Sequence, residues 1–237
     1  MKKVTNKLLF SGLAIIIVAF FVIVFSMMDF SDREEPIQDI RDDLTETEGA
    51  TETRQLDPFD GILTSGNYIK YVKSEKYELE IPSSKEVNEM VYENKLHISV
   101  VDKDYNLDGN VNTEPVVVYS PVCKIIENLF NTHIECDEID SDTITITNRD
   151  NGVVLVEKMD SKRVKLVNKS DGSINIANID ADYLNVRTED VGSVTISGTA
   201  RKAVISCEGT GKIDISGMTC PDISIQEGEE NVITRKE

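Results

Sequence analysis

Apolar and polar residues alternate with a period of two through most of the chain beyond residue 58. This alternation places side chains on opposite faces of an extended strand, which is typical of β-structure. The clearest alternating segments are 68–81 and 94–101, and 114–120 is a short apolar run rich in Val; all three are bounded by Gly, Asn, Asp and Ser residues that favour turns. Only residues 83–94 approach a helical pattern. The sequence therefore predicts an all-β fold for this part of the chain.

The segments 140–159, 160–179 and 180–199 repeat one pattern every 20 residues. Each begins with an aspartate and contains two apolar residues separated by a polar one, then a glycine, then a second such apolar pair. A fixed period of this length indicates units that cannot bury their own apolar face and must stack on a neighbour. The aligned apolar positions are Ile144, Val164 and Leu184; Ile146, Leu166 and Val186; Val154, Ile174 and Val194; and Val156, Ile176 and Ile196.

This period predicts a parallel β-helix, in which residues one coil apart lie over one another at about 4.8 Å and form columns. The apolar columns continue back to Ile134 and forward to Ile213, which is one residue short of the period. We expect the missing residue in the turn between Cys207 and Gly211, because turns tolerate changes of length. A β-sandwich of short antiparallel hairpins is the alternative, but hairpins do not require a match between residues one full period apart.

Residues 8–28 form an uncharged apolar stretch of 21 residues, long enough as a helix to cross a hydrocarbon core of about 30 Å. Lys2, Lys3 and Lys7 precede it and acidic residues follow it. Because positive flanks stay on the cytoplasmic side, we expect residues 1–7 in the cytoplasm and the C-terminal part in the periplasm or outside the cell. A cleaved signal peptide is the alternative, although its apolar region is usually only about 7–15 residues long.

Residues 29–57 differ sharply in composition from the segments on either side. They contain eleven acidic residues and three arginines, a net charge of −8, and few apolar residues. Such a segment cannot bury enough apolar surface to fold by itself. We therefore expect a disordered acidic linker that holds the folded part away from the membrane, with a charged helix as the alternative.

The segment 59–100, which opens with Phe-Asp-Gly-Ile and ends with an Asn turn before a Leu-x-Ile-x strand, resembles a known family. It is similar to the start of the putative auto-transporter adhesin, head GIN domain family. The units at 194–200 and 213–219 resemble that family's recurring Ile-x-Ile-Ser-Gly units. The resemblance implies an exported, right-handed β-helix over residues 58–237. The family has adhesin in its name and no established biochemical activity, so it implies no catalytic residues.

Composition excludes some classes of partner. The chain carries a formal charge of −18, which argues against nucleic acid, because binding to phosphates depends on an excess of Lys and Arg. There is no Trp and there are only two His, so aromatic stacking and imidazole chemistry have few candidates. We predict no cofactor.

The segment 104–109 contains Asp104, Asn106 and Asp108 at the spacing that opens a calcium loop. A bidentate carboxylate is then needed at the twelfth position, but that position is Pro115. The alternative is a polar hairpin loop that joins the strands on either side. We predict no metal site, and leave calcium at these three residues open.

Asp140, Asp160 and Asp180 form the most distinctive polar column. A stack of carboxylates is reminiscent of the acidic clusters of β-helix polysaccharide lyases and hydrolases, and it also suits cation binding. The alternative is that each aspartate caps a turn by accepting a bond from a backbone N–H group. We favour the caps and predict no catalytic residues.

The chain contains four cysteines, Cys123, Cys136, Cys207 and Cys220. Disulfides 123–136 and 207–220 are one of the three possible pairings in an oxidising compartment. Buried thiols are the alternative, because Cys136 occupies an inward apolar column. The two histidines, His97 and His133, alternate with inward residues and are expected on polar strand faces.

These features together predict a non-enzymatic membrane protein that is anchored through residues 8–28 and displays an external β-helix. Its expected role is adhesin-like binding or scaffolding at the cell envelope, with an envelope protein or glycan as partner. A carbohydrate-active enzyme that uses the aspartate column is one alternative. A domain that senses the state of the envelope is another.

Overall fold

The computed structural model describes residues 51–103, 114–227 and 232–235, and these belong to one compact unit. The predicted membrane anchor at 8–28 and most of the predicted linker lie outside the described residues. Within the described ranges, no helix is long and apolar enough to cross a membrane. Asp104, Asn106 and Asp108, at which calcium was left open, also lie outside them.

The described residues form sixteen strands that belong to one continuous sheet. The strands are β1 (Thr51–Gln55), β2 (Gly61–Gly66), β3 (Tyr68–Lys73), β4 (Glu78–Pro82), β5 (Lys85–Tyr92), β6 (Lys95–Asp102), β7 (Val116–Ser120), β8 (Ile125–Asn128), β9 (His133–Asp140), β10 (Thr143–Asn148), β11 (Val153–Asn168), β12 (Ser173–Thr188), β13 (Ser193–Cys207), β14 (Lys212–Thr219), β15 (Asp222–Glu227) and β16 (Val232–Thr234). Their arrangement confirms the all-β prediction.

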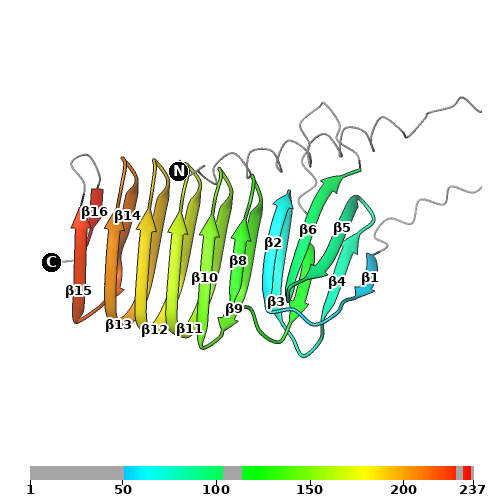
Figure 1. Cartoon of the computed structure of the whole chain (residues 1–237), viewed down its shortest axis with the longest axis horizontal. Coiled ribbons are helices and arrows are strands. Elements are labelled where there is room, and N and C mark those ends of the chain that lie inside the picture. Colours follow the sequence, from blue (N-terminus) through cyan, green and yellow to red (C-terminus); the bar gives the residue numbers. More distant parts are fainter. Residues whose placement is uncertain (1–50, 104–113, 228–231, 236–237) are drawn as a thin grey trace, which may run out of the picture. The chain divides into compact units, whose positions relative to one another are not determined.

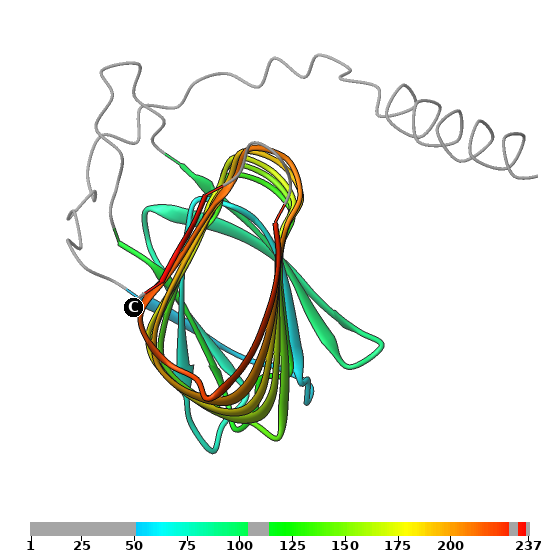
Figure 2. The same cartoon turned by 90° about the vertical axis from the view of Figure 1, so that its left-hand side faces the viewer.

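From β8 onward the sheet winds into a β-solenoid, and the described chain makes about five turns with coils of about 20 residues. Each coil crosses two faces. Face A contains β9, the first halves of β11, β12 and β13, and then β14 and β16; face B contains β8, β10, the second halves of the same three long strands, and β15. Figure 1 shows the coils stacked side by side, and they superpose when viewed along the stack in Figure 2.

The predicted columns are present in the register of the strands. Ile146 pairs with Leu166, which pairs with Val186, and all three side chains are fully buried. The column from Ile134 through Val154 and beyond is buried in the same way. All strand pairs within the solenoid are parallel among the described residues, so the sandwich alternative is wrong.

One coil is a residue shorter than the others, as predicted, but the missing residue is not in the predicted turn. The spacing is 20 up to the pair Ile176 and Ile196, and 19 from the pair Ile179 and Gly198 onward. The shortening therefore lies inside β13, at the corner between the two faces, and not between Cys207 and Gly211. Gly198 has φ = +119°, a backbone conformation that only glycine adopts without strain, and this residue absorbs the shortening.

The N-terminal strands do not follow the order of the chain. The first coil, β2 and β3, lies directly beside the coil of β8 and β9. The intervening strands lie farther out: β6 pairs with β2, and β7 pairs with β3. The expected hairpin across the segment 104–113 is therefore wrong, because the strands on either side of it belong to opposite faces.

Residues 83–94, which approach a helical pattern, nevertheless follow the all-β prediction: they contain β5, which pairs with β6 as an antiparallel hairpin through Glu93 and Asn94, both with positive φ. One further segment differs from its prediction. The linker was expected to extend to residue 57, but Thr51–Gln55 form β1 on the edge of β4. An edge strand of polar residues has no apolar signal, because its partner supplies only backbone hydrogen bonds.

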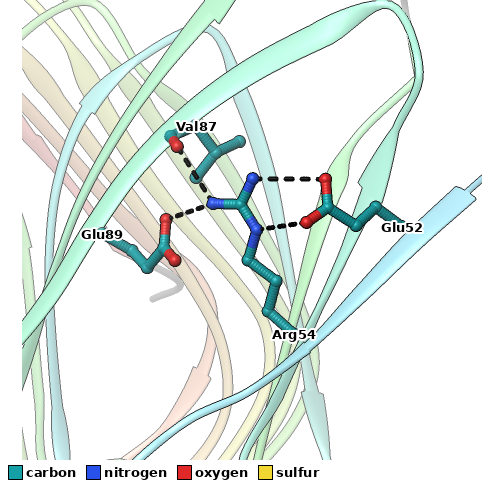
Figure 3. Close-up of polar contacts among 4 residues, drawn as sticks. All are labelled: Glu52, Arg54, Val87 and Glu89. Atoms are coloured by element: carbon teal, nitrogen blue, oxygen red, sulfur yellow. Dashed lines mark hydrogen bonds and ion pairs between the residues drawn. The ribbon is translucent and has the colours of Figure 1, made fainter.

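Arg54 connects the two outermost strands of the sheet, β1 and β5. Its guanidinium donates to Glu89 at 2.7 Å and to the Val87 carbonyl at 3.2 Å on β5, and pairs with Glu52 on its own strand at 2.6 Å (Figure 3). Nearby, the fully buried Lys85 pairs with Asp102. The Arg54 contacts hold the two faces together at the N-terminal end, and the Lys85–Asp102 pair joins the neighbouring strands β5 and β6.

A column of buried asparagines runs through the solenoid at the turn from face B to face A. Asn128, Asn148 and Asn168 are fully buried and lie directly over one another. The side-chain amide of Asn148 donates to the Gly152 carbonyl at 2.8 Å and to Oδ1 of Asn168 at 3.3 Å. Asn128 donates to Asn148 at 2.9 Å in the same way. Each amide thus closes its own turn and joins the next coil.

Glycines follow this column because the asparagine amides leave no room for a side chain. A Cβ atom on Gly152 would overlap the Asn128 amide nitrogen and the Thr132 carbonyl. Gly172 meets the Asn148 amide and the Gly152 carbonyl in the same way. Glycine recurs every 20 residues in the sequence because the asparagine amides and the neighbouring backbone approach these positions closely.

The four cysteines are thiols, which is the second of the two alternatives that the sequence left open. Cys123, Cys136 and Cys207 are buried, and Cys220 is half-buried. Burial raises the pKa of the Cys123 thiol to about 12 and also raises that of Cys136. Because the thiolate is the reactive form, these buried sulfurs behave as small apolar groups.

We predict that Asn148→Ala destabilises the fold strongly. The change leaves Oδ1 of Asn168 without this donor inside a dry core and removes one of the two donors of the Gly152 carbonyl, which keeps the Ser173 N–H group. A buried polar group without a partner costs about 1–3 kcal/mol. The expected loss in free energy of unfolding is about 2–4 kcal/mol, measured by denaturant titration. The matched control is Asn175→Ala, whose side chain points outward on face A and should change stability by less than about 0.5 kcal/mol. Equal effects of the two changes would contradict a structural role for the column.

We also predict that a thiol-specific alkylating reagent modifies Cys220 first in the native protein. The other three cysteines should react only after denaturation, because their sulfurs are covered. Mass spectrometry of native and unfolded samples measures this directly, and Cys220→Ser is the control that removes the early modification. Early modification of Cys123 or Cys136 would show that the interior is open.

Candidate functional surfaces

The structure places Asp140, Asp160 and Asp180 in direct register, as predicted, and all three are exposed at the corner from face A to face B. Lys73 donates to Asp140 at 2.6 Å, and this bond lowers the pKa of the Asp140 carboxyl. Thr199 donates to Asp180 at 3.1 Å. Two of the three carboxylates therefore already have partners from neighbouring strands.

At this corner, serines and not the aspartates make the side-chain hydrogen bonds to the backbone. The buried Ser141 donates its hydroxyl to the Thr143 carbonyl at 3.0 Å, and Ser161 donates to the Arg163 carbonyl at 3.2 Å. The described hydrogen bonds of Asp140 and Asp180 are instead made with side chains. These serines directly follow the aspartates at the same spacing of 20, so the signal was available in the sequence.

The two histidines lie where the alternation predicted. His97 lies between the buried residues Leu96 and Ile98 and is half-buried on the outer side. His133 contacts the Glu135 carboxylate at 2.9 Å, and the Tyr68 hydroxyl donates to the same carboxylate at 2.5 Å. These bonds lower the pKa of Glu135, while desolvation and the Glu135 carboxylate raise that of Tyr68 to about 12.

Among the residues that the structure describes, no group of three or more His, Cys, Asp or Glu side chains is placed to hold a metal ion. Asp140, Asp160 and Asp180 are all described, so the aspartate column does not form such a group. The candidate calcium ligands at 104–108 are not, and they remain a sequence-based hypothesis.

A hollow of about 250 Å³ lies beside the β5–β6 hairpin, and we name it the hairpin hollow. Its lining is largely apolar and includes Leu63, Met90, His97 and Leu129. Met90 is 58% exposed. Figure 2 shows that this hairpin projects from the side of the solenoid. No sequence pattern indicates this surface, because it joins residues from β2, β5, β6 and the loop after β8.

A second hollow, of about 410 Å³, lies at the corner where three successive coils enter face B, and we name it the corner hollow. It is lined by equivalent pairs of residues from each coil, namely Asp142 and Thr143, Lys162 and Arg163, and Asp182 and Tyr183. Lys162 pairs with Asp142 at 2.6 Å, and Arg201 of the next coil pairs with Asp182 at 3.2 Å. These positions belong to the 20-residue repeat, so the period alone was enough to bring them together.

Comparison with solved structures supports the fold. The chain is similar to a putative adhesin from Parabacteroides merdae ATCC 43184, with a TM-score of 0.62 and 17% identity over 76% of this chain and 78% of that chain. It is also similar to a putative lipid binding protein from Parabacteroides distasonis ATCC 8503, with a TM-score of 0.60 and 14% identity over the same shares. At such identities the likeness shows the fold alone. No curated protein matches the chain.

Comparison with protein families confirms the resemblance that the opening segment and the Ile-x-Ile-Ser-Gly units indicated. The match covers both the capped N-terminal strands and the regular coils of the solenoid. It extends over residues 58–231, and the chain therefore belongs to the family described as putative auto-transporter adhesin, head GIN domain.

Proposed function

We propose that this protein is a single-pass membrane protein whose external, right-handed β-solenoid binds another component of the cell envelope in the manner of an adhesin. Residues 8–28 are the anchor, residues 1–7 stay in the cytoplasm, and the solenoid lies in the periplasm or outside the cell. The partner is an envelope protein or glycan, and the protein catalyses no reaction.

The observation that supports this proposal best is that the β-solenoid carries two hollows on its surface. The corner hollow is built from residues that the coil-to-coil register holds in place, and the hairpin hollow is built from β2 together with the antiparallel β5–β6 hairpin that pairs with it. Side chains positioned in this way lose little freedom when a partner binds, which favours affinity. Family membership adds the adhesin-like role.

The aspartate column gives less support to the enzymatic alternative. A glycoside hydrolase needs one carboxyl group whose pKa is raised, so that it can donate a proton near neutral pH. Asp140 has the opposite shift, because Lys73 stabilises its charged form. Asp180 accepts a hydrogen bond from Thr199. These environments favour binding over proton transfer as the role of the aspartate column.

We predict that a C-terminal alkaline phosphatase fusion to the full chain is active in cells, whereas a β-galactosidase fusion at the same position is inactive. Alkaline phosphatase folds only after export, and the positive flank keeps residues 1–7 inside. Replacing Lys2, Lys3 and Lys7 together by Glu should lower the phosphatase activity several-fold. A highly active β-galactosidase fusion would contradict the proposed orientation.

We also predict that the compact unit, residues 47–237, retains a component of the envelope. The immobilised unit should bind saturably to material in a glycan fraction or a protein fraction from the same cells, as measured by surface plasmon resonance. The same unit unfolded in denaturant and immobilised equally is the control for nonspecific adsorption. Absence of retention from both fractions would contradict the binding role.

A further inference from the structure

The corner hollow has one cationic group whose charge is not compensated. Asp142 neutralises Lys162, and Arg201 neutralises Asp182. The guanidinium of Arg163 lies in the same hollow and has no ion-pair or hydrogen-bond partner among the described residues. A guanidinium, with five donors in a planar fork, is the side chain best suited to binding a carboxylate through two parallel hydrogen bonds.

The neighbours of Arg163 extend this site along face B. Lys165 is two residues farther on the same strand, points to the same side, and also has no ion-pair partner in the described chain. Tyr183 pairs with Arg163 on the next coil, and Thr143 pairs with it on the preceding one. The site thus presents two cations, an aromatic ring and a hydroxyl group at strand spacing.

The combination of donors and acceptors indicates the class of ligand. A sugar ring carries apolar C–H groups that pack on an aromatic face, and hydroxyl groups that donate to carboxylates such as Asp142 and Asp182. A peptide of aspartates and glutamates has carboxylates for Arg163, but it has no side-chain hydroxyl groups to donate to these two aspartates and no sugar ring to pack on Tyr183. Only a ligand with both a carboxylate and several hydroxyl groups uses every group in the hollow.

We propose that the corner hollow binds a carboxylated sugar of a short or sparsely charged glycan, with Arg163 as the carboxylate-binding residue and Tyr183 as the ring platform. This inference rests on the proposed binding function and specifies its ligand class and site. The volume of about 410 Å³ lies in the ordinary range of ligand pockets, about 300–1,000 Å³.

The overall charge limits the length of the ligand. Residues 58–237 carry a net charge of −13, since the whole chain carries −18, the first seven residues +3, and residues 29–57 −8. A long polyanion would be repelled wherever it extended beyond Arg163 and Lys165. An isolated acidic sugar avoids this repulsion.

The test measures binding of trigalacturonate to the full chain in detergent by isothermal titration calorimetry. The wild-type chain should bind it, and Arg163→Gln should weaken binding about tenfold or more, because a charge-assisted bidentate contact is worth at least about 1.4 kcal/mol. Tyr183→Ala should weaken binding as well. Arg187→Gln is the matched control, because it removes the same charge from face B outside the hollow, where Arg187 pairs with Glu208 at 2.8 Å; it should change affinity by less than about twofold.

Two further ligands test the chemistry. The methyl ester of trigalacturonate keeps the sugar rings and loses the charge, whereas a triglutamate peptide keeps the charge and lacks the rings, and both should bind about tenfold more weakly or worse. Equal binding of either ligand, equal losses for Arg163→Gln and Arg187→Gln, or no binding by the wild-type chain would overturn the inference. If envelope material is still retained in those cases, the proposed function stands and only this site assignment fails.

Discussion

The structure depends on the parallel pairing of each coil with the next at a spacing of 20 residues. This pairing satisfies the backbone polar groups and at the same time places branched aliphatic side chains over one another in a dry interior. Because the period of side chains along a strand is two, a slip of one residue would expose an entire apolar column. Register and core are therefore one constraint, and each coil imposes it on its neighbour.

The asparagine column strengthens this constraint at the turn between faces. An amide that donates both to its own turn and to the next coil is satisfied only when the coils are correctly stacked. Where the column ends, Thr188 and Cys207 take the same place, and Thr188 donates to the Cys207 sulfur at 2.9 Å. The buried Cys207 thus belongs to the polar column, and its thiol also donates to the Gly211 carbonyl at 3.4 Å.

A solenoid also needs an end that does not recruit further strands. At the N-terminal end of the described chain, the antiparallel strands β1, β4 and β5 break the parallel pattern, and the Arg54 contacts join the two faces. The same irregularity makes the β5–β6 hairpin project and creates the hairpin hollow. The corner hollow arises differently, because it is part of the repeat and owes its character to which side chains the three coils carry.

Much of this molecule could be inferred from the sequence by itself. The all-β class, the parallel solenoid, the inward columns and the stacking of Asp140, Asp160 and Asp180 all follow from two periods, because the repeat brings equivalent residues together wherever it holds. The family could be recognised from short motifs for the same reason. The prediction failed where the repeat is broken, at β1, in the order of the N-terminal strands and at the shortened corner of β13.

Those features were decided only by the tertiary structure, because they depend on contacts between residues that no period relates. Arg54 meets Glu89 across 35 residues, and Leu63 meets Met90 and Leu129 in the hairpin hollow. Whether a charge is compensated is also a property of the fold: Lys162 and Arg163 are adjacent in the chain, yet only Lys162 has an acidic partner among the described residues. The repeat determined which residues share a face, and the three-dimensional contacts determined which of them remain available to bind a ligand.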